Sequence, residues 1–217
     1  MKHCTKLVTL FCLVAFVGSV QAEEACKEAC KSACKGCALS SKALADLPAF
    51  VYKIGDETTD NPAEAAKISR NSGNKIQFIG AGKEFEVESD AFAFTVAETE
   101  KFVAKFAAPK KCEVSGQTTV AGKKVCCDVA ASQVAAIAKK AMDSVQVSYR
   151  VGKTSVCCPD AAKALAKKTG EKVVQCVGND ASGCGLTTRL KLAQARYIAI
   201  VEAIAASDKK ATEKSET

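Results

Sequence analysis

The sequence predicts an α+β fold in which β-hairpin–helix units repeat behind a Cys-rich N-terminal helix. Three observations predict it: an internal repeat that aligns without a gap, short apolar alternations on either side of glycines, and apolar residues at three- and four-residue steps after each hairpin. Antiparallel strands packed under helices satisfy all three patterns at once.

Residues 1–22 have the three-part layout of a secretory signal peptide. Lys2 and Lys6 precede the apolar run 7–18, and Ala22 ends a small-residue cleavage site. The run is shorter than the roughly 20 apolar residues that a membrane-spanning helix needs. We therefore expect cleavage, export to the periplasm or the extracellular space, and no membrane span after cleavage.

Residues 23–47 are predicted to form an amphipathic helix with a stripe of cysteines. Cys26, Cys30, Cys34 and Cys37 follow one another at steps of four, four and three residues. On a helix they lie within about 80° of one another but are spread over about 16 Å of its axis, so a single metal ion cannot bind all four. We expect the stripe to hold soft ions between neighbouring turns, or to pair with a second copy of the chain or another exported protein.

The internal repeat divides the rest of the chain. Residues 52–73 align on residues 149–170, which places Asn61 over Cys158. In both copies a proline opens the helical run and a glycine follows it, as expected at the first turn and at the C-cap of a helix. We predict one hairpin–helix pair at 48–108, a single unit at 109–144, a second pair at 145–206, and a disordered polar tail at 207–217.

The composition excludes several classes of function. The only histidine is His3, inside the signal. The mature chain therefore lacks Ser-His-Asp and Cys-His catalytic systems and any zinc site that needs imidazole. Removing the two signal lysines lowers the net charge from +7 to +5, and that charge is spread along a chain without tryptophan. Aromatic stacking platforms for single-stranded nucleic acid are scarce, so we expect neither nucleic-acid binding nor enzymatic activity.

Sulfur is the remaining chemistry. Of 13 cysteines, 11 lie outside the signal, and an odd number leaves at least one without an intrachain partner. The repeat places Cys127, Cys158 and Cys184 at the position of Asn61, the N-cap of a helix. An oxygen-bearing side chain is usual there, and the helix terminus favours thiolate. Cys126 and Cys157 directly precede two of these caps. Two interpretations stay open: disulfide or core cysteines, and metal-binding or reactive thiols.

One segment resembles a known family of small metal-associated modules. Residues 111–116 (KCEVSG), the short hairpin that ends in Cys126 and Cys127, and the helical run after it resemble the knuckle, hairpin and helix of YHS and TRASH modules. The resemblance covers about residues 111–140, and a similar copy lies at 149–170. It implies binding of a heavy or soft metal ion, with Cys112, Cys126 and Cys127 in the ligand places.

The leading hypothesis is an exported, non-enzymatic protein that binds copper(I) or zinc through cysteines. The candidate ligands are Cys26, Cys30, Cys34, Cys37, Cys112, Cys126, Cys127, Cys157, Cys158, Cys176 and Cys184. We expect one group of thiols at 112, 126 and 127 and a second at 157, 158, 176 and 184. The alternatives are a disulfide-stapled structural or interaction protein and, less favoured, a thiol-redox protein using Cys34 and Cys37.

Processing is directly testable. Mass spectrometry of exported protein is expected to give Glu23 as the N-terminal residue, because the small-residue site ends at Ala22. Exported material that still begins at Met1 would contradict the signal and restore a membrane anchor.

Overall fold

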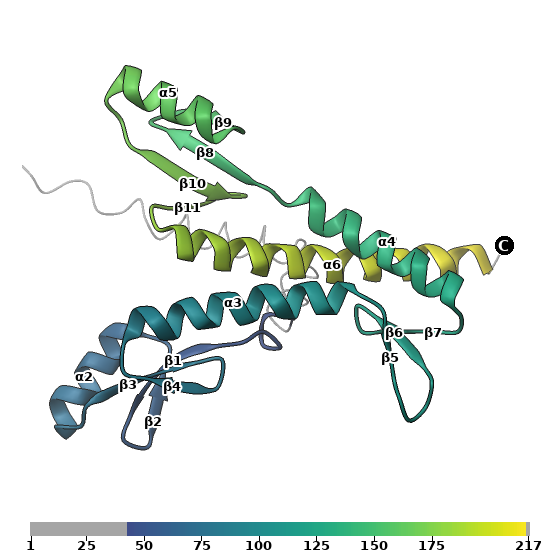
Figure 1. Ribbon diagram of the computed structural model, residues 1–217, viewed down its shortest axis with the longest axis horizontal. Helices are drawn as coiled ribbons and strands as arrows, with labels where there is room; N and C mark the ends of the chain where they lie inside the picture. The colour runs from purple at the N-terminus through teal and green to yellow at the C-terminus, as the bar shows by residue number, and fades with distance from the viewer. Residues whose placement is uncertain (1–42, 216–217) are drawn as a thin grey trace, which may run out of the picture. The chain divides into compact units, whose positions relative to one another are not determined.

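The computed structural model describes residues 43–215, with side chains as far as residue 208 (Figure 1). The predicted signal and the thiols Cys26, Cys30, Cys34 and Cys37 lie outside the described residues. Of the helix predicted at 23–47, only the end is described: residues 43–44 are helical and 45–47 form a turn. None of the helices within 43–215 is long and apolar enough to cross a membrane.

The first unit consists of two hairpins, each followed by a helix. In chain order its elements are β1 (Phe50–Ile54), β2 (Glu57–Thr59), α2 (Pro62–Ser72), β3 (Ile76–Gly80), β4 (Lys83–Phe85) and α3 (Glu88–Ala107). The strands form one antiparallel sheet in the order β2-β1-β3-β4. Tyr52 and Ile54 on one face of this sheet pack with Ala65 of α2, and the Tyr52 hydroxyl donates a hydrogen bond to Glu88 of α3. Both helices therefore cover the same face of the sheet.

The last unit repeats this arrangement. Its elements are β8 (Val147–Val151), β9 (Thr154–Val156), α5 (Pro159–Thr169), β10 (Val173–Val177), β11 (Asp180–Ser182) and α6 (Gly185–Ser215). Each of them begins 97 residues after its counterpart, as Val147 follows Phe50. The pairing register is also the same, since Phe50 opposite Gly80 becomes Val147 opposite Val177. The predicted repeat and α+β class are thereby confirmed.

The middle unit is a shortened copy. It contains β5 (Lys110–Lys111), β6 (Thr118–Val120), β7 (Lys123–Val125) and α4 (Asp128–Ser144), with a three-stranded sheet in the order β5-β6-β7. Strand β7 and helix α4 begin 40 residues after β4 and α3, as Lys123 follows Lys83. Strand β5 takes the place of β1, and a turn at 112–117 replaces β2 and α2. The middle unit thus contains one hairpin and one helix, with β5 as a further strand.

The main core forms where α6 packs against α3 and α4. Ala193, Tyr197, Ile200 and Ile204 form the buried stripe of α6. The Tyr197 ring lies 5.6 Å from that of Phe102 and 4.8 Å from that of Phe106, both on α3. At the rim of this contact, the Arg189 guanidinium forms two hydrogen bonds to Glu100.

The C-terminal residues correct one prediction. Residues 207–217 were expected to be disordered, but α6 continues as far as Ser215. The segment is rich in Ala, Lys and Glu, which have high helix propensity. Extending an existing helix needs no new nucleation, so a polar composition alone does not end it.

Gly80 is required by a close approach between β3 and α3. A Cβ at this position would lie 2.8 Å from the Thr95 hydroxyl oxygen and against the Ala91 carbonyl. We expect Gly80→Ala to lower the free energy of unfolding by about 1–3 kcal/mol, the usual cost of overpacking. Chemical denaturation measures it.

Gly183→Ala is the matched control for this change. Nothing lies within 4 Å of a Cβ built at Gly183, which does not have a positive φ. An equal loss of stability in both variants would contradict the close packing of β3 on α3.

Candidate functional site

Three cysteines stand at helix N-termini, as predicted. Cys127 and Cys158 are the N-caps of α4 and α5, and the carbonyl of Cys184 accepts the Thr188 N–H at the start of α6. In the first unit, Asn61 caps α2 by accepting the N–H groups of Ala63 and Glu64. Neither Cys127 nor Cys158 makes a side-chain capping bond of this kind. Their thiols are therefore poor replacements for a capping oxygen.

The predicted place of all three thiols over Asn61 is wrong for two of them. Cys158 lies over Asn61, as the sequence indicated, whereas Cys127 and Cys184 lie over Val87, the N-cap of α3. Val87 makes no side-chain capping bond either. The first unit thus carries no thiol at either of its caps.

Nearby donors stabilise the thiolate form of three exposed cysteines. The backbone N–H of Ala130, followed by the Cys126 thiol, lowers the pKa of Cys127, although neighbouring Asp128 acts in the opposite direction. The backbone N–H and hydroxyl of Thr187 lower the pKa of Cys184. These effects are the attraction between a thiolate and the donors of a helix terminus.

The turn that follows Cys112 also lowers the pKa of its thiol. The Ser115 hydroxyl, and then the backbone N–H groups of Ser115 and Val114, lower the pKa of its thiol. The turn is closed by hydrogen bonds from the Cys112 N–H to the Gln117 carbonyl and from the Gly116 N–H to the Cys112 carbonyl.

The middle sheet brings three of the candidate ligands to one end. Strands β5 and β7 both pair antiparallel with β6, so they run in the same direction. Cys112 directly follows β5, and Cys126 directly follows β7. The sulfur atoms of Cys126 and Cys127 lie 3.8 Å apart, and all three thiols are exposed. Two strand spacings, about 10 Å, separate the ends of β5 and β7.

The second predicted group of thiols is not assembled. Strands β9 and β11 are the two outer strands of their sheet and run in opposite directions. Cys157 and Cys158 therefore leave one end of the sheet and Cys184 the other. Cys176 lies inside β10 and is buried. Within residues 43–215, no three His, Cys, Asp or Glu side chains form a group that could hold a metal ion as they stand.

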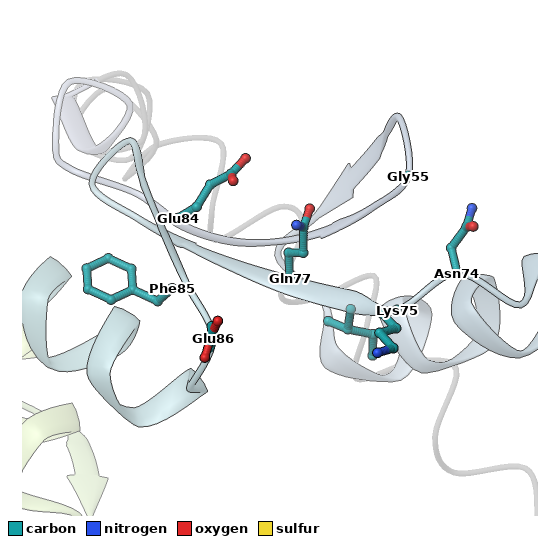
Figure 2. A pocket seen from close by; sticks show the side chains of 8 residues that line it. Gly55, Asn74, Lys75, Gln77, Glu84, Phe85 and Glu86 are labelled. Atoms are coloured by element: carbon teal, nitrogen blue, oxygen red, sulfur yellow. The ribbon is translucent and has the colours of Figure 1, made fainter.

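The outer face of the sheets, away from the helices, carries residues that sequence analysis did not single out. In the first sheet, Gln77, Glu84 and Glu86 line an open pocket, and Figure 2 shows Gln77 and Glu84 projecting on one side while Phe85 points to the other. The corresponding residues in the middle unit are Gln117, Lys124 and Cys126. The 40-residue offset in the sequence indicates these correspondences, since Gln77 and Gln117 occupy the same place in the two units.

Lys53 also lies on the outer face of the first sheet and has a counterpart in the middle sheet. Its ammonium forms a 2.8 Å ion pair with Glu84 across the outer face of the first sheet. By register, Lys53 corresponds to Cys112 and Glu84 to Lys124. The places of Cys112 and Lys124 thus lie on one face, within reach of a long side chain.

Comparisons with known proteins identify no relative. A scan with protein-family models finds no match, and searches of curated proteins and of solved structures find no significant one. The resemblance of residues 111–140 to YHS and TRASH modules stays a prediction.

The lowered pKa of Cys127 depends in part on its neighbour. We expect Cys126→Ala to raise the pKa of the Cys127 thiol, because one of the groups that stabilise its thiolate is removed. The pH dependence of alkylation, followed at this site by peptide mass spectrometry, measures the shift.

Cys184 is the control in the same sample. Its pKa is lowered by Thr187 and Leu186, which the substitution does not touch. An unchanged alkylation midpoint at Cys127, or an equal shift at Cys184, would contradict this assignment.

Proposed function

We propose that the chain is an exported, non-enzymatic protein that binds a soft metal ion, copper(I) or zinc, through cysteine thiolates. The observation that carries the proposal is the gathering of Cys112, Cys126 and Cys127 at one end of the middle sheet, two of them with adjacent sulfurs. Thiolates are the ligands that select copper(I) and zinc over harder cations.

The spacing of the two adjacent sulfurs fits a shared ion. Two thiolates bound to one tetrahedral zinc at about 2.3 Å are about 3.8 Å apart. The Sγ atoms of Cys126 and Cys127 lie 3.8 Å apart. The lowered pKa of Cys127 also favours binding, because each thiol must lose its proton to become a ligand.

Cys112 is the natural third ligand. Cys112 lies at the same end of the sheet as Cys126, its thiol is exposed, and the pKa of this thiol is lowered as well. The turn at 112–117 would have to fold toward β7 to close the distance of about 10 Å between the outer strands. Val114, at the tip of this turn, is almost fully exposed, so no packing opposes that movement.

The alternative of a disulfide-stapled module receives no support from the described residues. The seven cysteines between residues 43 and 215 are all unbonded. Six of them are exposed, which suits ligands or reactive thiols better than core residues.

Metal uptake by the reduced protein tests the proposal. Titration with copper(I) or zinc against a chromophoric chelator is expected to show binding with release of protons. Cys126→Ser/Cys127→Ser is expected to remove a stoichiometric share of the metal, and Cys112→Ser to weaken binding of the same share.

Cys184→Ser provides the matched control. Cys184 is also exposed with a lowered pKa, but it follows a strand of another sheet, and Gly183 stands before it where Cys126 stands before Cys127. We expect this variant to bind as much metal as the unaltered chain. Negligible uptake by the reduced chain, or equal uptake by the double variant, would show that these thiols are not ligands.

A further inference from the structure

The outer face of the middle sheet places lysines beside the dithiol. Lys110, Thr119 and Lys124 are direct partners across the three strands and form one row. Side chains alternate between the faces of a strand, so Cys112 and Cys126, two residues further on, belong to the same face. Cys127 follows on the opposite face, but its sulfur lies only 3.8 Å from that of Cys126. Lys110 and Lys124 are in no ion pair with a residue that the structure describes, whereas Lys123 on the opposite face pairs with Asp208.

The local charge is positive. Residues 110–128 contain four lysines against Glu113 and Asp128. The ion pair between Lys53 and Glu84 demonstrates that long side chains at the corresponding places of the first sheet bridge its outer face. A ligand that carries carboxylates can therefore contact a lysine ammonium while it lies against the sulfurs.

We propose that the Cys126–Cys127 dithiol undergoes thiol–disulfide exchange with anionic low-molecular-weight disulfides of the glutathione disulfide type, and that Cys127 is the residue that becomes thiolated. This goes beyond metal binding and does not require a metal ion. The Cys127 thiolate attacks one sulfur of the disulfide. A new sulfur–sulfur bond forms to Cys127, the old one breaks, and the second half leaves as a thiolate that takes a proton from water.

The adduct is expected to persist beside a second thiol. Attack by Cys126 would close a disulfide between consecutive residues, whose Cα atoms are about 3.8 Å apart. Ordinary disulfides join Cα atoms that are about 4.4–6.8 Å apart, so this ring is strained. Closure by Cys126 is therefore unfavourable, and Cys112 lies two strand spacings, about 10 Å, away. The mixed disulfide is the expected product while the lysines hold its carboxylates.

Cys184 supplies an internal comparison. It stands at the same cap position with an exposed thiol and a lowered pKa. Ser148 and Ala181 occupy the places of Lys110 and Lys124 in its sheet. The two sites thus share the helix terminus and differ in the lysines and in the preceding residue, which is Gly183 in place of Cys126. The ratio of two rates at one cysteine cancels the difference in thiol reactivity.

The experiment compares two disulfides on the reduced, metal-free full chain. Glutathione disulfide is anionic and cystamine is cationic, and peptide mass spectrometry follows the rate of thiolation at each cysteine. The ratio of the anionic to the cationic rate is expected to be at least about threefold higher at Cys127 than at Cys184 at low salt, and to fall as ionic strength rises. Cys126→Ser should keep the adduct, and Cys127→Ser should lose it.

Charge variants separate the lysine face from the helix terminus. Lys110→Gln/Lys124→Gln is expected to bring the ratio at Cys127 down to that at Cys184. Lys139→Gln/Lys140→Gln, two exposed lysines of α4, changes the net charge equally and should leave it unchanged. Ala181→Lys should raise the ratio at Cys184.

Two results would overturn the proposal. One is an equal ratio at Cys127 and Cys184 in the unaltered chain. The other is loss of two hydrogens from the peptide with Cys126 and Cys127, without an adduct, which would mean that the strained ring closes. Neither result bears on metal uptake, which is measured with the ion alone.

Discussion

The contact between α3 and α6 is the constraint on which the rest of the described structure depends. These are the corresponding helices of the two full units, and each also covers its own sheet. The Tyr197 ring fills the space beside Phe102 and Phe106, and Ile200 is completely buried. Because α6 also packs against α4, one stripe of side chains joins all three units into a single core. The two thiol-capped helices that contribute to this core, α4 and α6, begin at exposed cysteines, Cys127 and Cys184.

Differences between the units lie mainly at positions that this core does not use. The register and the turns are kept, and even the left-handed turn residue recurs as Ala81, Ala121 and Gly178. On the outer face, Glu84 and Glu86 of the first sheet give way to Lys124 and Cys126 in the middle sheet. Exposed side chains can change without cost to packing, so one scaffold carries an acidic pocket at one place and a dithiol at another.

Local patterns in the sequence were sufficient for the elements but not for the second thiol group. Proline and glycine mark both ends of α2 and α5, and Gly152 has the positive φ that a tight turn there favours. Whether Cys158 and Cys184 meet depends instead on the strand order β11-β10-β8-β9, which is fixed by pairing between residues far apart in the chain. The lysine row on the middle sheet was missed for the same reason, because Lys110 and Lys124 become neighbours only through β6.

The cap positions explain why thiols could replace oxygens at little structural cost. Asn61 satisfies two backbone N–H groups of α2, but Cys158 at the equivalent place satisfies none, and α5 has the same length as α2. These helices are exposed at their first turn, where water can supply the missing acceptor. What the cysteine adds is an acceptor that becomes strong only when it loses its proton, and at Cys127 and Cys184 the helix termini favour that loss. A weak cap in the neutral state is thus the same feature that makes the thiol available to a metal ion or a disulfide.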